Sequence, residues 1–236
     1  MVDQESSNAL IRVRGLHRTF MDGAVEVHAL RGIDLDVEAG EFSVLAGASG
    51  SGKTTLLNQI GCLDRPTKGT VTVDGVDVSA FGKREAAEFR LNKIGFVFQA
   101  YNLIPVLSAY ENAEFVMMLK GTPKEERKKT VEGLLSEVGL DGMFDRRPHE
   151  LSGGQQQRVA VVRAIAGHPS VVLADEPTAN LDSKTSAALL DLMVQLNEEH
   201  GVTFLFSSHD HDVIDRCRRV IRLDSGQVIE DERKDR

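Results

Sequence analysis

The sequence predicts an α/β protein: a mostly parallel sheet with helices, an antiparallel β subdomain near the start of the chain and an inserted helical subdomain. After residue 158, apolar runs alternate with amphipathic segments, as they do when helical crossovers join parallel strands. The early chain holds short strand-like runs separated by turn residues. We therefore expect one domain over 1–236, with a core and its β subdomain in 1–98 and 158–236 and a helical subdomain in 99–157.

Composition narrows the classes of partner. Hydrophobic residues make up 41% of the 236 residues, and the net charge is −8. Binding along a DNA duplex needs a surplus of Lys and Arg, so we expect no nucleic-acid partner. Two cysteines are too few for a disulfide framework and fit a reducing compartment. The polar start is not expected to be a signal peptide, and no run approaches the ~20 apolar residues that span a bilayer.

The elements of the first hundred residues follow from apolar patterning and turn residues. Leu10–Arg14 and Ile33–Val37 are expected to form strands of an antiparallel edge sheet. The run Phe42–Ala46 is continuously apolar, which is typical of a strand buried on both faces. A glycine-rich stretch and a helix over Lys53–Ile60 follow it. A hairpin over Gly69–Val78 then turns at Asp-Gly, and a further strand covers residues 94–98.

Helical periodicity and capping residues define the rest of the chain. Thr122 begins a capping box with Pro123 at the first helical position, and Gly139 ends that helix. Ser152 is expected to cap a second helix that runs to Ala166. Strands at 171–174 and 202–206 alternate with a helix that carries the apolar stripe 189–196. The tail 231–236 is expected to be frayed and exposed.

Residues 47–54, GASGSGKT, match the pattern G-x-x-x-x-G-K-[ST] between a buried strand and a helix. Glycines allow the backbone to approach phosphate oxygens, and the free N–H groups of the helix start favour negative charge. Lys53 is expected to reach the outer phosphates and Thr54 to ligate Mg²⁺. A chance match would occur in on the order of 1% of chains of this length, and the strand–loop–helix context makes chance still rarer.

A second acidic site follows the apolar strand Val171–Ala174. Asp175 and Glu176 end that strand, and ligands in open α/β sheets bind at the carboxyl ends of strands. Asp175 could hold Mg²⁺ while Glu176 polarises the attacking water. Alternatively, Asp175 caps the turn at Pro177 and Glu176 is merely exposed. The neighbouring phosphate loop favours the catalytic interpretation.

Several motifs together resemble those of ATP-binding cassette (ABC) ATPases. The segment LSGGQQQR at 151–158 is similar to the family's LSGGQ motif. Gln99 follows the strand IGFVF as the family's Q-loop glutamine does. The segment Ala179–Asp182 resembles the D-loop, and His209 resembles the switch histidine. The resemblance covers essentially the whole chain, and its nearest branch contains the ATPase subunits of lipoprotein-release and macrolide-export transporters.

The resemblance implies a P-loop NTPase core that binds ATP and Mg²⁺ and hydrolyses ATP. Phe20 stands where the branch has an aromatic residue that stacks on adenine. The implied catalytic residues are Glu176, His209, Lys53 and Gln99, and the implied Mg²⁺ ligands are Thr54, Gln99 and Asp175. The implied nucleotide contacts are Phe20, Gly47, Ala48, Ser49, Gly50, Ser51, Gly52, Lys53, Thr54, Thr55, Gln99, Ser152, Gly153, Gly154, Gln155 and Asp182.

In this family, Ser152 and Gly154 would act on the ATP held by a second copy, so a head-to-tail homodimer around two ATPs is implied. The expected partner is an integral membrane permease subunit, which would place the chain in the cytoplasm, peripheral on the inner face of the cell membrane. The complex would serve export, lipoprotein release or mechanotransmission. A soluble cassette ATPase of DNA repair or translation is the alternative. His209 and His211 could also suggest a metal cluster, but their spacing does not place them on one helix face.

Overall fold

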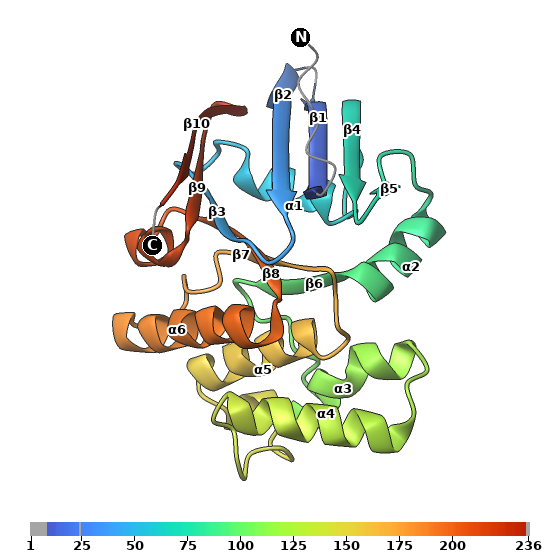
Figure 1. The fold of residues 1–236 in the computed structure, drawn as a ribbon, viewed down its shortest axis with the longest axis vertical. Helices are drawn as coiled ribbons and strands as arrows, with labels where there is room; N and C mark the ends of the chain where they lie inside the picture. The colour runs from blue at the N-terminus through green and yellow to red at the C-terminus, as the bar shows by residue number, and fades with distance from the viewer. Residues whose placement is uncertain (1–8, 24, 235–236) are drawn as a thin grey trace.

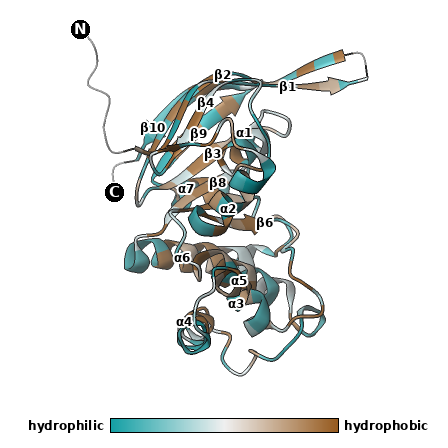
Figure 2. Cartoon of the chain, turned by 90° about the vertical axis from the view of Figure 1, so that its right-hand side faces the viewer, coloured by the Kyte–Doolittle hydropathy of each residue, from teal (hydrophilic) through white to brown (hydrophobic). Residues whose placement is uncertain are grey.

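The computed structural model describes residues 9–23 and 25–234, which form two sheets and a group of helices (Figure 1). The first sheet is antiparallel and confirms the predicted β subdomain. Its strand order is β2-β1-β4-β5. The bounds of its strands are Ala9–Asp22 for β1, Val25–Glu38 for β2, Lys68–Val73 for β4 and Val76–Asp77 for β5. The far ends of β1 and β2 extend as a ribbon away from the body of the molecule (Figure 2).

The second sheet has the order β10-β9-β3-β8-β7-β6 and is parallel except for its edge pair β9–β10. This mixed sheet with its helices confirms the predicted α/β class. The strands are β3 (Phe42–Ala46), β6 (Ile94–Phe98), β7 (Val171–Asp175), β8 (Thr203–Ser208), β9 (Arg219–Asp224) and β10 (Gln227–Arg233).

The helices lie around this sheet and below it in Figure 1. A single 3₁₀ turn, Pro148–Glu150, precedes α5 in the described chain. The helices are α1 (Lys53–Ile60), α2 (Lys83–Lys93), α3 (Ala109–Leu119), α4 (Lys124–Glu137), α5 (Gly153–Ile165), α6 (Ser183–His200) and α7 (His211–Arg216).

Both faces of the parallel sheet are buried, which explains the continuous apolar runs of its strands. On one face, Leu45, Leu173 and Leu205 pack in a cluster that includes α1 and the antiparallel sheet. On the other face, Val44 and Phe206 pack with α5, α6 and α7. The central strands are therefore held between two apolar layers, and their carboxyl ends form a rigid edge.

The helical segment has a third apolar cluster of its own, made by α3, α4 and α5. Helix α5 belongs to two clusters, because Val161 and Ile165 face the sheet while Val159 and Val162 face α3 and α4. The predicted boundary near residue 157 thus falls inside a helix that packs on both sides. The division into subdomains stays a prediction, and α5 joins the two clusters together with Leu134 of α4 and Leu192 of α6, which pack against both.

Several elements differ from the sequence-based expectation. Helix α2 was not predicted: none of its residues is fully buried, and it packs against the core through Ala86 and Phe89, which form only a short apolar pattern. Helix α4 begins at Lys124 with Pro123 as its N-cap and no side-chain cap, so the capping box predicted at Thr122 is wrong. The tail prediction is also wrong through Arg233, because β10 pairs with β9; residues 235–236 lie outside the described chain.

An ion pair between a buried arginine and a carboxylate of the last strand explains why the tail is ordered. The guanidinium of Arg219 in β9 donates to both carboxylate oxygens of Asp231 in β10, at 2.8 and 2.7 Å. This hydrogen bonding holds the pKa of Asp231 below its ordinary value. Arg219 also donates to Glu41, just before β3, at 3.0 Å. A pairing across 12 residues that depends on such a contact cannot be inferred from local periodicity.

Asn112 fastens the loop between β6 and α3. Its side chain is fully buried, its Oδ1 accepts from the N–H of Ile104 at 2.7 Å, and its Nδ2 donates to the carbonyls of Ile104, Leu107 and Ser108. One amide therefore satisfies four backbone groups that have little access to water, a task that few other side chains can perform.

We expect Asn112→Ala to lower the free energy of unfolding by about 2–4 kcal/mol, because the N–H of Ile104 and the carbonyl of Leu107 lose the partner that the side chain supplies. For a chain of this size the melting temperature should fall by about 5–10 °C. Thermal unfolding followed by circular dichroism measures this. Asn92→Ala is the matched control, because the Asn92 amide is exposed and donates only to the carbonyl of Glu88; it should leave the melting temperature unchanged. Equal effects of the two changes would contradict the prediction.

Candidate nucleotide-binding site

The register of three parallel strands brings the predicted site residues to one edge of the sheet. Ala46 at the end of β3 pairs with Ser208 of β8, and Ser207 pairs with Asp175 of β7. The segments that leave these strands therefore start side by side. They carry the phosphate loop, the acidic pair and His209, which are far apart in the sequence.

The phosphate loop has a backbone shape that only glycine accommodates well. Gly47 and Gly52 have φ angles of 153° and 107°. A Cβ at Gly47 would collide with the carbonyl oxygen of Leu223 in β9, and one at Gly52 would lie 2.7 Å from the carbonyl oxygen of Ala29. Both glycines let the loop lie directly against neighbouring backbone, so its conformation is set before any ligand binds.

Polar groups of the loop are prepared for an anion. Lys53 is 6% exposed as a residue, and its ammonium donates to the carbonyls of Gly47 and Ala48 at 2.7 and 3.0 Å. The hydroxyl oxygen of Ser51 is buried and has no hydrogen-bond partner in the described structure. A cation curled over a loop of backbone N–H groups, next to an unsatisfied hydroxyl, suits phosphate oxygens.

Thr54 and Asp175 are directly linked at the mouth of the loop. The Thr54 hydroxyl donates to Asp175 Oδ1 at 3.0 Å, and Gln99 lines the same cleft. A hydroxyl, a carboxylate and an amide oxygen form the all-oxygen donor set that Mg²⁺ prefers. These three residues therefore fit the magnesium site that the sequence predicts.

Glu176 is the centre of a hydrogen-bonded group at the ends of β7 and β8. Its Oε1 lies 2.7 Å from Nδ1 of His209, and its Oε2 accepts from the hydroxyl of Ser208 at 3.0 Å. The side chain of Glu176 is 16% exposed, whereas that of His209 is 68% exposed. The carboxylate is thus oriented by fixed partners, and the imidazole extends from it into solvent.

These residues line one cleft of about 550 Å³, a volume in the range of small-molecule sites. Phe20 and Ala29 of the antiparallel sheet line the same cleft as the phosphate loop and the acidic pair. Of the predicted site residues, the cleft brings together Phe20, Ser49, Gly50, Gly52, Lys53, Thr54, Thr55, Gln99, Asp175, Glu176 and His209. Gly47, Ala48 and Ser51 belong to the same loop but are not among the residues that line the cleft.

The remaining predicted contacts lie elsewhere in the same chain. Ser152 caps α5 by accepting from the N–H of Gln155, and Asp182 caps α6 by accepting from Thr185. The hydrogen bonds to Thr185 hold the pKa of Asp182 below its ordinary value. Gly154 packs close to the methyl group of Thr185. None of the described residues 152–155 and 182 lines the cleft, so a chain does not cover its own cleft with this segment.

Sequence reasoning missed some residues of the site. Ser208 holds the general-base candidate Glu176, and Ala29 and Ala179 line the cleft. The polar pair that ends the strand TFLFSS was the available signal for Ser208. Ala29 reaches the cleft because the β1–β2 register shifts between Arg18 and Thr19, and a shift of that kind has no sequence signal here.

A glycine-rich loop between a parallel strand and a helix, with acidic residues at the end of a neighbouring strand, defines a P-loop nucleoside-triphosphatase site. A match to a protein-family model identifies the family. Residues 30–179 match the model described as ABC transporter, and the chain belongs to that family. It binds ATP and hydrolyses it.

Relatives along the whole chain are transporter components. An uncharacterised ABC transporter ATP-binding protein of Thermotoga maritima is 48% identical over 212 residues, which cover 90% of each chain. A macrolide export ATP-binding/permease protein, MacB, of Brucella melitensis is 44% identical over 95% of this chain. The chain spans only 35% of that MacB. These matches favour a transporter ATPase over the DNA-repair and translation alternatives.

Solved structures agree with this assignment. The cassette MJ0796, in a dimeric post-hydrolysis state bound to ADP and Pi, has a TM-score of 0.87 and 40% identity; the match covers 96% of this chain and 99% of that one. Another dimeric structure of MJ0796 has a TM-score of 0.88 and 41% identity, with the same coverage. Within the described residues, we find no helix with the length and apolarity needed to span a membrane.

We expect Gly47→Ala to weaken ATP binding at least ~10-fold, because a methyl group at a positive φ must push the loop away from the backbone of β9. Titration with a fluorescent ATP analogue measures the dissociation constant. Gly40→Ala is the control: its φ is 78°, but nothing lies within 4 Å of the added carbon, and the residue is outside the cleft. Weaker binding in both variants would mean that backbone strain, rather than the collision, is responsible.

Proposed function

We propose that two copies of this chain close head to tail around two ATP molecules and thereby drive a membrane-embedded permease. The observation that carries this proposal is the composition of the cleft. It holds the phosphate loop, the acidic pair and His209 of one chain, but not that chain's Ser152–Gln155 segment. That segment is a helix N-terminus with Ser and Gly residues, well suited to a phosphate. The related cassette is dimeric, which supports the proposal that the Ser152–Gln155 segment over each cleft comes from a second copy.

Within one cleft, each residue has a role that its contacts support. The Lys53 ammonium would give up its hydrogen bonds to the two loop carbonyls and donate to phosphate oxygens instead. Gln99, which also lines the cleft, would contact the bound Mg-ATP. Glu176 would accept a proton from the attacking water, since its two fixed partners orient its carboxylate. His209, hydrogen-bonded to Glu176, would contact the terminal phosphate. Thr54, Gln99 and Asp175 would hold Mg²⁺, which supplies positive charge for the phosphate oxygens.

We expect Glu176→Gln to retain ATP binding and to lose hydrolysis by ~10²-fold or more, because the amide cannot accept the proton of water. Phosphate release at saturating ATP and nucleotide titration separate the two quantities. Glu232→Gln, the same change at an exposed position of β10, should leave both unaltered. Turnover close to that of the unaltered chain in Glu176→Gln would remove Glu176 from this role.

We expect Ser152→Arg to abolish ATP-dependent dimerisation when it is combined with Glu176→Gln, since a long cation at the start of α5 would block the approach of the second copy. Light scattering after size-exclusion chromatography with Mg-ATP measures the mass. Gln195→Arg adds the same side chain on an exposed face of α6 and should leave the dimer intact. A dimer that persists with Ser152→Arg would refute the head-to-tail arrangement.

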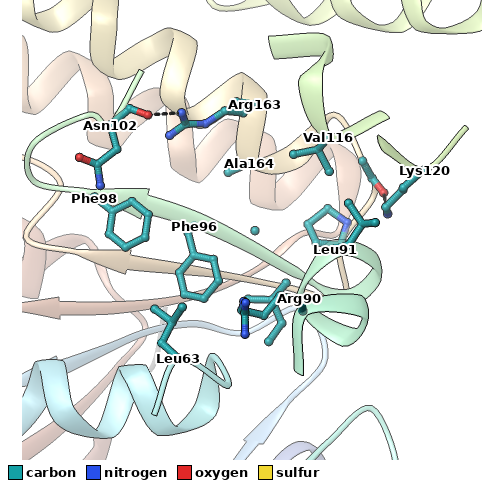
Figure 3. Close-up of a pocket in the computed structure, with 15 residues that line it drawn as sticks. Leu63, Arg90, Leu91, Phe96, Phe98, Asn102, Val116, Lys120, Arg163 and Ala164 are labelled. Carbon is teal, nitrogen blue, oxygen red and sulfur yellow. Dashed lines mark hydrogen bonds between the residues drawn. The ribbon is translucent and has the colours of Figure 1, made fainter. Parts of the chain in front are cut away.

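We further propose that the permease binds in a groove between the sheet and the helical segment (Figure 3). The groove has a volume of about 360 Å³ and lies between α2 and β6 on one side and α3 and α5 on the other. Phe96 and Phe98 stack on its floor with a ring separation of 5.4 Å. Phe98 directly precedes Gln99, so the groove and the ATP cleft share one strand end. A partner seated here would sense the position of Gln99.

The charge of the groove indicates the chemistry of the partner segment. Arg90, Lys120 and Arg163 line it, and none of the described lining residues is acidic. Burial lowers the pKa of Lys120, with a smaller contribution from Lys93, and burial alone lowers that of Arg163. Arg163 donates to the carbonyls of Tyr101 and Asn102 just after Gln99. We infer that the permease inserts a short segment with apolar side chains and an acidic residue or a helix C-terminus.

The resemblance to MacB and to lipoprotein-release ATPases suggests what the complex does: export, lipoprotein release or mechanotransmission. Attachment to the permease would keep the chain in the cytoplasm on the inner face of the cell membrane. In this proposal the permease, which would contact the cargo, determines what is moved.

We expect Glu176→Gln, used as bait with Mg-ATP in detergent-solubilised native membranes, to retain one multi-span membrane protein. Adding Ala87→Glu should abolish this retention, because Ala87 is an exposed residue of α2 in the groove and the new charge would face the inserted segment. Adding Ala188→Glu, on an exposed face of α6, should not. Retention of the membrane protein by the Ala87→Glu bait would place the docking surface elsewhere.

A further inference from the structure

The aromatic residue of the ATP cleft is covered on one side by a cation. The guanidinium carbon of Arg18 lies over the Phe20 ring, 4.2 Å from its centroid, which is the spacing of a cation–π contact. Phe20 lines the cleft, whereas Arg18 is not among the described residues that do. Arg18 thus contacts the ring without itself lining the cleft, and Phe20 is among the residues that do.

Arg18 is itself fixed by a carboxylate that follows α1. Its Nε donates to Oδ2 of Asp64 at 2.6 Å. The same carboxylate accepts from Nε2 of Gln59 at 2.9 Å and from the backbone N–H of Arg65 at 2.8 Å. The side chains of Arg18 and Asp64 are only 23% and 29% exposed. Partial burial and several donors make this a better-defined ion pair than a pair of solvated side chains.

These contacts connect the aromatic ring to the helix that carries the phosphate loop. Gln59 belongs to α1, and the first turn of α1 holds Lys53 and Thr54. The backbone adds a contact with the segment that follows α1: the N–H of Thr67, just before β4, donates to the carbonyl of His17 in β1 at 2.8 Å. Phe20, which would contact a base, and the phosphate loop are thus both linked to α1, although Phe20 lies in the antiparallel sheet and the loop follows a strand of the other sheet.

We propose that Arg18 is a positioning residue for the base of the nucleotide: it fixes the Phe20 ring at the cleft and links that ring to α1. This inference rests on the proposed ATP-driven function and on the stacking of Phe20 on adenine that the family resemblance implies. Arg18 acts through Phe20 and is remote from the reacting phosphates. Loss of Arg18 should therefore weaken the binding of a ligand that carries a base. It should leave unchanged the binding of a ligand that has phosphates alone, and also the rate of hydrolysis at saturating ATP.

Calorimetric titration of the full chain with ATP and, separately, with inorganic tripolyphosphate tests this proposal. We expect Arg18→Ala to raise the dissociation constant of ATP by about 3–10-fold and to leave that of tripolyphosphate unchanged, because a cation–π contact is worth about 1 kcal/mol. The kcat at saturating ATP should not change, so the effect is confined to KM. Arg18→Lys retains a cation and should restore part of the ATP affinity. Arg31→Ala, an exposed arginine of β2, is the control.

The double variant with Phe20→Ala decides between positioning and a purely structural role. If Arg18 acts through the ring, Arg18→Ala should have no further effect on ATP binding once Phe20 is removed. Equal weakening of ATP and tripolyphosphate, or effects that simply add, would overturn the proposal. If Phe20→Ala weakens ATP binding and Arg18→Ala does not, only the role of Arg18 is refuted. If Phe20→Ala leaves ATP binding unchanged, the adenine stack itself is refuted, and the inference falls with it.

Discussion

The register of β3, β8 and β7 is the constraint on which the site depends. Side chains alternate between the two faces of each strand, so a slip of one residue would exchange the apolar layers on both sides of the sheet. Both layers are closely packed, and the register is therefore strongly determined. Because Ala46, Ser208 and Asp175 end their strands at one level, three short segments meet there. The packing of the core thereby sets the distances between the phosphate loop, the acidic pair and His209.

Helix α5 extends this rigidity to the rest of the molecule. It packs on the sheet with one face and on α3 and α4 with the other, and it begins at Ser152, the residue that we propose contacts the ATP of a second copy. Its last turn carries Arg163, which holds the carbonyls just after Gln99. A displacement of this one helix would therefore move residues at the proposed dimer surface, beside the ATP cleft and in the groove proposed for the permease.

The parts of this architecture that were predictable from the sequence are those with local causes. Strands such as Phe42–Ala46 are buried on both faces and appear as apolar runs, and the phosphate loop is a contiguous motif. Helix α2 has no fully buried residue and only a short apolar pattern, and β10 depends on the Arg219–Asp231 ion pair, so neither was predictable from local periodicity. Three site residues were identifiable from sequence patterns: Lys53 from the phosphate-loop motif, and Asp175 and Glu176 from the acidic pair that follows an apolar strand. The roles of Ser208 and Arg18 depend on which strands lie next to each other, and this requires the three-dimensional structure.

The backbone at Glu176 carries a cost of its own. Its φ angle is 45°, in the left-handed region where glycine is comfortable and a branched or long side chain is not. A non-glycine residue held in such a conformation costs of order 1–3 kcal/mol, which the surrounding structure must offset. Selection for thermal stability alone would thus tend to replace this glutamate with glycine. A glutamate with this backbone conformation puts activity and stability in conflict, and thermostable but inactive forms of the chain would be expected to arise first at this position.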